Sequence, residues 1–270
     1  MRLCTTVSKA KLDMGLHDII RHYERSKFWS QRGSCIGRQT AIALSAAGWS
    51  LTLTARRLTQ LEETKAACAN PESCLLVDGD ITSEAFVKTL FDQTIERFGR
   101  LDLLFNNAGI SDKVYPIEEM PLELFTSVVN VNLVASFLCT REAFKIFKSQ
   151  TPTGGRIINN GSLAAHVPRP NSAAYACSKH AVSGLTKSSA IEGRSFDISV
   201  TQIDIGNAHT SMTAGHTLGA LQPDGRRVDE PTFNVVHVAQ TIVHVASLPN
   251  SVTMLEVNIM ATGAPYAGRG

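Results

Sequence analysis

Apolar residues recur along most of the chain in alternating helical and strand-like patterns. The segment 37–48 (GRQTAIALSAAG) places Ala41, Leu44 and Ala47 three residues apart, on one side of a helix. It ends at Gly48, a residue type that commonly terminates helices. The segment that follows is rich in residues that favour strands, so a helix followed by a strand is expected here.

The same alternation continues to the end of the chain. Helices are expected at 37–48, 58–69, 83–99, 121–150 and 173–195, and strands at 49–57, 74–80, 101–109, 155–162, 198–206 and 253–262. The strand that begins LDLLF has apolar residues facing both ways, which is typical of parallel strands covered by helices on both faces. The pattern predicts one α/β domain built on a doubly wound parallel sheet.

Composition agrees with a folded protein and excludes several functional classes. The 270 residues are 43% hydrophobic and 19% charged, which argues against disorder. The net charge is +2 without a run of Lys or Arg, so no nucleic-acid surface is expected. Cys68 and Cys74 lack companion ligands at zinc spacing, so no metal site is expected.

Location is expected to be cytoplasmic. No apolar stretch is expected to approach the length of a membrane span, so no membrane partner is expected. The first residues place Lys9, Lys11 and Asp13 where a signal peptide needs its apolar region. Scattered cysteines fit reduced thiols in an intracellular protein.

The clearest chemical signal is a tyrosine followed four residues later by a lysine. Tyr175 and Lys179 lie in a predicted helix, where residues four apart share a face. A phenol ionises near pH ~10, too high for acid–base work at neutral pH, but a nearby cation favours the phenolate. The pair can therefore serve general acid–base catalysis. Alone, the spacing also fits an exposed pair without function.

Other motifs accompany this pair in a particular order. A glycine-containing turn precedes the first helix, NNAG (106–109) closes a strand, Asn132 lies in the long middle helix, and Ser162 ends a strand. Ser162 is followed by the Tyr-x-x-x-Lys pair. This order resembles the short-chain dehydrogenase/reductase family, from about residue 34 to residue 263. The resemblance implies a Rossmann fold and an oxidoreductase that interconverts a carbonyl and a secondary alcohol.

The resemblance also implies a role for each catalytic residue. Tyr175 would donate the proton in reduction and accept it in oxidation. Lys179 would favour the phenolate and hold the nicotinamide ribose. Ser162 would hydrogen-bond the reacting oxygen. Asn132 would hold a water that links Lys179 to solvent.

Cofactor-binding residues follow from the same resemblance. The expected set is Gly33, Ile36, Gly37, Arg56, Asp80, Ile81, Asn107, Ala108, Gly109, Tyr175, Lys179, Gly206 and Thr210. Two positions depart from the family pattern. Ile205 replaces the usual proline before Gly206, and Gly161 replaces the commoner serine before Ser162, a change expected to have no chemical role.

The end of the second strand favours NADP(H) over NAD(H). An acidic residue there would bind the ribose hydroxyls of NAD. Here Ala55 is followed by Arg56 and Arg57, and guanidinium groups suit a ribose 2′-phosphate. Two solvated arginines at the start of a helix are the alternative.

The glycine turn and the first strand are the weak part of the resemblance. The family has Thr-Gly-x-x-x-Gly-x-Gly, whereas residues 30–37 read SQRGSCIG and keep only the last signature glycine. Gln31 replaces a glycine in the tight turn, and Cys35 adds a Cβ near the pyrophosphate, with possible backbone strain. Before the turn, residues 22–30 (HYERSKFWS) are charged, and KFWS is the single candidate for the first strand.

The chain therefore divides into an atypical segment, 1–33, and a dinucleotide-binding and catalytic domain, 34–270. Three explanations of the segment stay open. An exon boundary or reading frame was misassigned; or cofactor binding is naturally weakened; or the segment supplies a compensating strand and NADP binds differently. The alternative function is a cofactor-impaired binding or scaffold protein.

The long irregular segment 207–231 is expected to cover the substrate, a small molecule that the sequence does not identify. The resemblance also implies a homodimer or homotetramer, assembled through the helices at 121–150 and 173–195.

Overall fold

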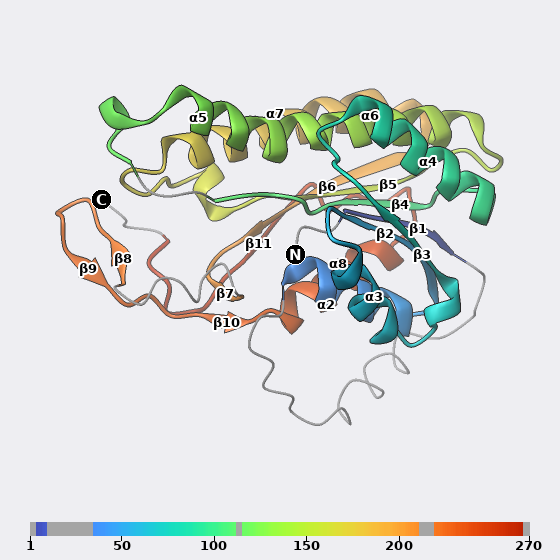
Figure 1. The fold of residues 1–270 in the computed structure, drawn as a ribbon, viewed down its shortest axis with the longest axis horizontal. Coiled ribbons are helices and arrows are strands. Elements are labelled where there is room, and N and C mark those ends of the chain that lie inside the picture. Colours follow the sequence, from blue (N-terminus) through green and yellow to red (C-terminus); the bar gives the residue numbers. More distant parts are fainter. Residues whose placement is uncertain (1–3, 10–34, 112–114, 211–218, 267–270) are drawn as a thin grey trace.

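A computed structural model describes residues 4–9, 35–111, 115–210 and 219–266 (Figure 1). Its main sheet contains the strands β1 (Cys4–Lys9), β2 (Trp49–Ala55), β3 (Cys74–Asp78), β4 (Leu103–Asn106), β5 (Gly155–Asn160), β6 (Ile198–Ile205) and β11 (Glu256–Ile259). Across the sheet the strands follow the order β11–β6–β5–β4–β1–β2–β3. This is the order of a doubly wound dinucleotide-binding sheet, so the predicted fold class is confirmed.

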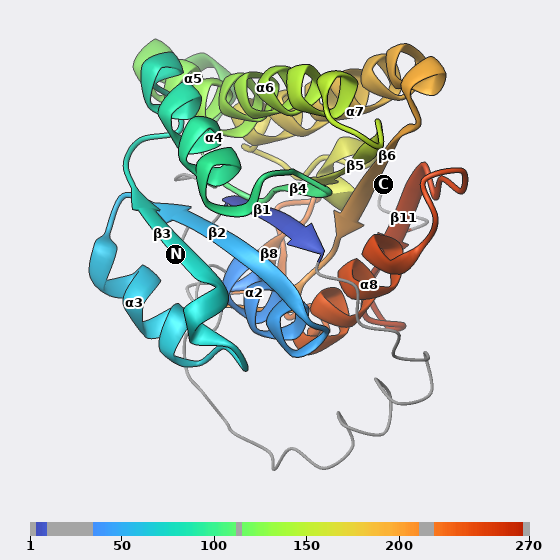
Figure 2. The same ribbon diagram turned by 90° about the vertical axis from the view of Figure 1, so that its right-hand side faces the viewer.

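Helices cover both faces of the sheet. They are α2 (Ile36–Ala46), α3 (Leu58–Ala66), α4 (Glu84–Phe98), α5 (Leu122–Val129), α6 (Ala135–Ser149), α7 (Ala173–Gly193) and α8 (Val236–Ser247). Figures 1 and 2 show α4, α5, α6 and α7 on one face and α2, α3 and α8 on the other. Successive residues of β4 pack against the two helix layers in turn. Leu103 and Phe105 belong to the core under α2 and α8, while Leu104 belongs to the core under α4 and α6.

The interior strand β1 runs antiparallel to both of its neighbours. β1 pairs antiparallel with β2, where Cys4 lies opposite Thr54 and Lys9 opposite Trp49, and antiparallel with β4. The pairs β2–β3, β4–β5, β5–β6 and β6–β11 are parallel. The expectation of a wholly parallel sheet is therefore wrong at β1, and the expected first strand, KFWS, lies outside the described residues.

The direction of β1 changes how the chain reaches the first helix. In a parallel first strand the carboxyl end would lead directly into the turn before α2. Here Lys9, the last residue of β1, lies beside Trp49, the first residue of β2. β1 therefore ends at the edge of the sheet opposite to that where β2 ends, and residues 10–34 separate it from α2.

The middle helix is apolar enough to resemble a membrane span. The stretch Leu122–Ser149 has a mean hydropathy of 1.6 over its best window, of which 33% is buried, in contrast to the expectation that no stretch approaches such a length. It is continuous across a π-helical turn at Asn130–Val134. Its contacts with α7 and with β4 and β5 are those of a helix that packs on a sheet.

One helix was not expected. α8 follows the substrate segment and packs against α2. Its buried residues include Val238, Ile242 and Val245, at positions i, i+4 and i+7 of an amphipathic helix. The apolar pattern that predicts this helix was therefore present in the sequence.

We expect the substitution Thr6→Pro to destabilise the protein strongly. Proline removes a backbone N–H and is excluded from strands that have neighbours on both sides. Thr6 pairs with both Thr52 and Leu104. The free energy of unfolding in urea should fall by roughly 1–3 kcal/mol, the cost of leaving a buried backbone group without its partner. The control Thr6→Val keeps the backbone donor and should stay near wild type. An unchanged midpoint for the proline variant would show that β1 does not occupy the interior of the sheet.

Candidate active site

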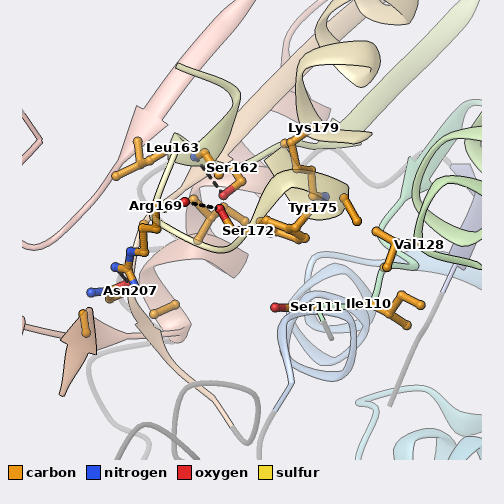
Figure 3. A pocket seen from close by; sticks show the side chains of 18 of the residues that line it. Ile110, Ser111, Val128, Ser162, Leu163, Arg169, Ser172, Tyr175, Lys179 and Asn207 are labelled. Atoms are coloured by element: carbon orange, nitrogen blue, oxygen red, sulfur yellow. Dashed lines mark hydrogen bonds between the residues drawn. The ribbon is translucent and has the colours of Figure 1, made fainter. Parts of the chain in front are cut away.

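The site lies where β4, β5 and β6 end side by side. Asn106 at the end of β4 pairs with Asn159 of β5, and Asn160 at the end of β5 pairs with Ile203 of β6. Parallel strands bring their carboxyl ends to one edge of a sheet, where open α/β sheets bind ligands. A cavity of about 420 Å³ opens beyond these ends. Figure 3 shows side chains that line it.

Ser162 follows β5 and caps a short 3-10 helix, Leu163–Ala165. Its Oγ accepts a hydrogen bond from the backbone N–H of Ala164 at 3.2 Å. Since that contact uses a lone pair, the hydroxyl proton remains available to another acceptor. The side chain lines the same cavity as Tyr175 (Figure 3).

Tyr175 and Lys179 lie one helical turn apart on α7, and both line the cavity. The Lys179 side chain is 4% exposed, and its Nζ lies 5.6 Å from the centre of the Tyr175 ring. The same Nζ donates a hydrogen bond to the carbonyl oxygen of Asn160 at 2.7 Å. The predicted sharing of one helix face is therefore confirmed, and the ammonium is tied to the end of β5.

Asn132 lies within the π-helical turn and is 2% exposed. Its Oδ1 accepts from the N–H of Ile110 at 2.7 Å, and its Nδ2 donates to the Ile110 carbonyl at 3.0 Å and to Ser178 Oγ at 2.9 Å. A Cβ on Gly109 would lie 3.4 Å from Asn132 Oδ1 and 3.9 Å from Lys179 Nζ. The NNAG turn, the middle helix and α7 thus meet at one place.

The residues expected at the adenosine end line a second cavity of about 590 Å³. Arg56 follows β2 and is exposed, while Asp80 and Ile81 follow β3, and all three line this cavity with Ala108. Asp80 accepts hydrogen bonds from the N–H and the hydroxyl of Thr82. The cavity lining does not include Arg57, which caps α3.

The predicted glycine turn is only partly within the described residues. Gly33 lies outside them. Ile36 lines the first cavity at the start of α2, and Gly37 is buried one residue later. Cys35 precedes the helix with φ −97° and ψ 157°, which is ordinary extended backbone. The backbone of Cys35 is therefore not strained, in contrast to the expectation.

Asn107, Gly109, Gly206 and Thr210, which were also expected to bind the cofactor, line the same cavity. Asn160 Nδ2 donates to Asn107 Oδ1 at 2.9 Å, which joins the turns after β4 and β5.

Sequence reasoning missed a polar network that holds the segment 207–231. Glu230 is buried; it forms an ion pair with Arg169 and accepts from Asn207 Nδ2 at 2.7 Å and Gln222 Nε2 at 3.2 Å. Arg169 and Asn207 both line the cavity (Figure 3). The network joins both ends of the segment 207–231 to the loop before α7. No motif marks it.

Comparison with known proteins decides the family. A model described as "short chain dehydrogenase" matches residues 32–219. The chain belongs to the short-chain dehydrogenase/reductase family.

Curated relatives of this short-chain dehydrogenase/reductase include several named reductases. Levodione reductase of Leifsonia aquatica is 36% identical over 198 residues, covering 72% of this chain and 73% of the relative. The 3-oxoacyl-[acyl-carrier-protein] reductase of Synechocystis is 33% identical over 180 residues, covering 66% and 72%. The chain is therefore an oxidoreductase of this family.

Solved structures of similar proteins support the same family and fold. A short-chain dehydrogenase from Bacillus anthracis has a TM-score of 0.72 at 26% identity and covers 84% of this chain and 91% of its own. The 3-ketoacyl-(acyl-carrier-protein) reductase of Brucella melitensis, complexed with NADH, has a TM-score of 0.73 at 25% identity, covering 84% and 93%. This short-chain dehydrogenase/reductase therefore shares a nicotinamide-cofactor-binding fold.

We expect Asn132→Ala to lower the free energy of unfolding by about 2 kcal/mol, because it leaves the buried backbone groups of Ile110 without their side-chain partner. The matched control is Asn130→Ala, which removes an exposed amide two residues earlier and should change stability by less than about 0.5 kcal/mol. Chemical denaturation of both variants gives the comparison. Equal effects would show that the buried amide contributes nothing beyond helix propensity.

Proposed function

We propose that this protein is an NADP(H)-dependent oxidoreductase that interconverts a ketone and a secondary alcohol, with Tyr175 as the acid–base group. The observation that carries the proposal is the convergence of Ser162, Tyr175 and buried Lys179 on one cavity. The chemistry needs a proton donor, a hydrogen-bond donor to the reacting oxygen and a nearby positive charge, and these three side chains supply them.

In reduction, Tyr175 gives its hydroxyl proton to the carbonyl oxygen of the substrate. The Ser162 hydroxyl, whose lone pair is engaged by the N–H of Ala164, donates its proton toward the same oxygen. Negative charge that remains on the phenol oxygen is stabilised by the Lys179 ammonium, which the Asn160 carbonyl holds next to the tyrosine ring. In oxidation, Tyr175 accepts the proton of the alcohol, and Ser162 keeps its hydrogen bond to the same oxygen.

The described residues fit a nicotinamide dinucleotide. Lys179, Thr210 and Ile36 line the first cavity, and the missing Cβ of Gly109 keeps the wall beside Lys179 open. The start of α2 adds N–H groups of the kind that bind phosphates at helix ends. When bound, the cofactor supplies or accepts the hydride.

Arg56 supports the preference for NADP(H). It is exposed in the second cavity, and among the described residues it forms no ion pair. A 2′-phosphate would give it a partner of opposite charge. Solved relatives bind either cofactor: the Brucella melitensis reductase carries NADH, and the structure described as ElxO carries NADP at 25% identity.

The substitution Tyr175→Phe should abolish turnover and leave cofactor binding nearly intact. The phenyl ring keeps the packing on α7 but has no proton to transfer. We expect kcat for the best substrate of a ketone and alcohol screen to fall at least ~100-fold, within the range reported for general acid–base groups. NADPH fluorescence titration should give a dissociation constant within about threefold of wild type, a difference below 1 kcal/mol. The control Tyr115→Phe removes a hydroxyl outside the cavity lining. Undiminished turnover of Tyr175→Phe would exclude the proposed acid.

The cofactor preference has its own matched pair of variants. Arg56→Ala should weaken NADPH binding by about tenfold, equivalent to about 1.4 kcal/mol, and leave NADH binding unchanged. Arg57→Ala removes the neighbouring guanidinium, which does not line the cavity, and should alter neither constant. Fluorescence titration with both cofactors provides the measurement. Equal losses for the two variants would indicate only a general charge effect.

A second function is favoured by one observation. Because β1 runs antiparallel and does not lead directly into α2, the usual strand–turn–helix cradle for pyrophosphate is not built from β1. A fold with impaired cofactor binding would serve as a binding or scaffold protein. Wild-type titration separates the two: no saturable NADPH binding below millimolar concentration would favour the scaffold.

We further propose a homo-oligomer in the cytoplasm. Leu122 of α5, Phe137 of α6 and Ile191 of α7 are large apolar residues that are 73%, 47% and 63% exposed. Apolar side chains on these helices are suited to contact a second copy.

A further inference from the structure

We propose that Asp204 is a positioning residue for Ser162, held by His166 and accommodated by the glycine at position 161. The proposal rests on the function proposed above, in which Ser162 donates a hydrogen bond to the reacting oxygen. Asp204 lies near the end of β6, next to the turn that carries the serine.

The carboxylate of Asp204 has no exposed surface and is surrounded by donors. Its Oδ1 accepts from the backbone N–H of Ser162 at 2.8 Å and from Gln202 Nε2 at 2.8 Å. Its Oδ2 lies 2.8 Å from His166 Nε2, which carries the proton in this contact because a carboxylate only accepts. A buried charge is tolerated only when it is paired and hydrogen-bonded in this way.

These bonds fix Ser162 from two sides. Asp204 holds its backbone N–H, and the N–H of Ala164 donates to its Oγ. With both groups held, the torsion that directs the hydroxyl into the cavity is restricted. His166 belongs to the same short turn, so the carboxylate anchors its start at Ser162 and its end at His166.

Gly161 is explained by the same carboxylate. A Cβ at this position would lie 2.0 Å from Asp204 Oδ1 and 2.8 Å from Gln202 Cγ. No side chain fits there while Asp204 keeps its bonds to Ser162. The absence of the commoner serine, expected to have no chemical role, is thus a steric requirement of the carboxylate behind the active site.

A double-mutant cycle tests whether Asp204 acts through Ser162. Asp204→Ala should lower kcat by about 10- to 100-fold in the wild-type background, the range expected for misplacing one stabilising donor. In a Ser162→Ala background the same change should lower kcat by less than about threefold, because there is no hydroxyl left to position. NADPH affinity should stay within about threefold in each variant. Equal losses in both backgrounds would overturn the proposal, since general damage to the fold acts without regard to Ser162.

Two further variants guard against misfolding. Asp204→Asn keeps an acceptor for the Ser162 N–H and should retain most of kcat. Thr201→Val, on the same strand, removes a buried hydroxyl that has no hydrogen-bond partner among the described residues, and should behave as wild type.

The steric role of Gly161 has its own pair of variants. Gly161→Ala should lose activity, and Gly161→Ala combined with Asp204→Ala should regain part of it through relief of the clash. Failure of the double variant to exceed Gly161→Ala would remove the steric link.

The test also has a readout that needs no turnover. An amide proton bound to a carboxylate resonates downfield, so the ¹⁵N-serine spectrum should show the Ser162 amide moving upfield in Asp204→Ala but much less in Asp204→Asn. If wild type turns over no carbonyl compound, the proposed function fails, while the amide resonance still decides the contact. An unmoved resonance in Asp204→Ala would overturn the positioning role whether or not the enzyme is active.

Discussion

The buried ammonium of Lys179 is the constraint on which the arrangement of the site depends. A cation almost without contact with solvent is tolerated only where polar groups surround it. Its hydrogen bond to the Asn160 carbonyl requires that α7 pack directly over the end of β5. The absence of a side chain at Gly109 then lets the turn after β4 approach the same group. One charge thus determines the relative positions of three segments that are distant in sequence.

Separate sets of hydrogen bonds hold other loops that line the cavity. The side-chain amide of Asn132 accepts from the N–H of Ile110 and donates to its carbonyl oxygen. The Glu230 network joins the segment 207–231 to the loop before α7. Buried and fully satisfied polar networks specify one geometry, because each alternative leaves a group without a partner. Catalysis by oriented dipoles requires geometry of this kind, since the donors must be in place before charge develops.

Local patterns predicted most of the fold and the central residues of the site. The four-residue spacing of Tyr175 and Lys179 determines that they share a helix face, and the apolar faces of the fourth strand require helices on both sides of the sheet. The helix α8 carried an equally clear signal that was overlooked. The networks of Asp204 and Glu230 could not be predicted in this way. Neither residue belongs to a motif, and each network depends on contacts between distant parts of the sequence: His166 lies 38 residues from Asp204, and Arg169 lies 61 residues from Glu230.

A compensating strand from the segment 1–33 was one of the three explanations left open, but the antiparallel direction of β1 was beyond prediction. The position of β1 between β2 and β4 has a consequence for how the protein is made. β1 pairs with residues 49–54 and 103–105, so it leaves the ribosome long before its second neighbour exists. If β1 does not dock between them, β2 and β4 each present an unpaired edge, and such edges recruit strands from other chains. By pairing with both strands, β1 protects these edges against aggregation, and a fusion placed next to Cys4–Lys9 would add bulk to the strand that covers them.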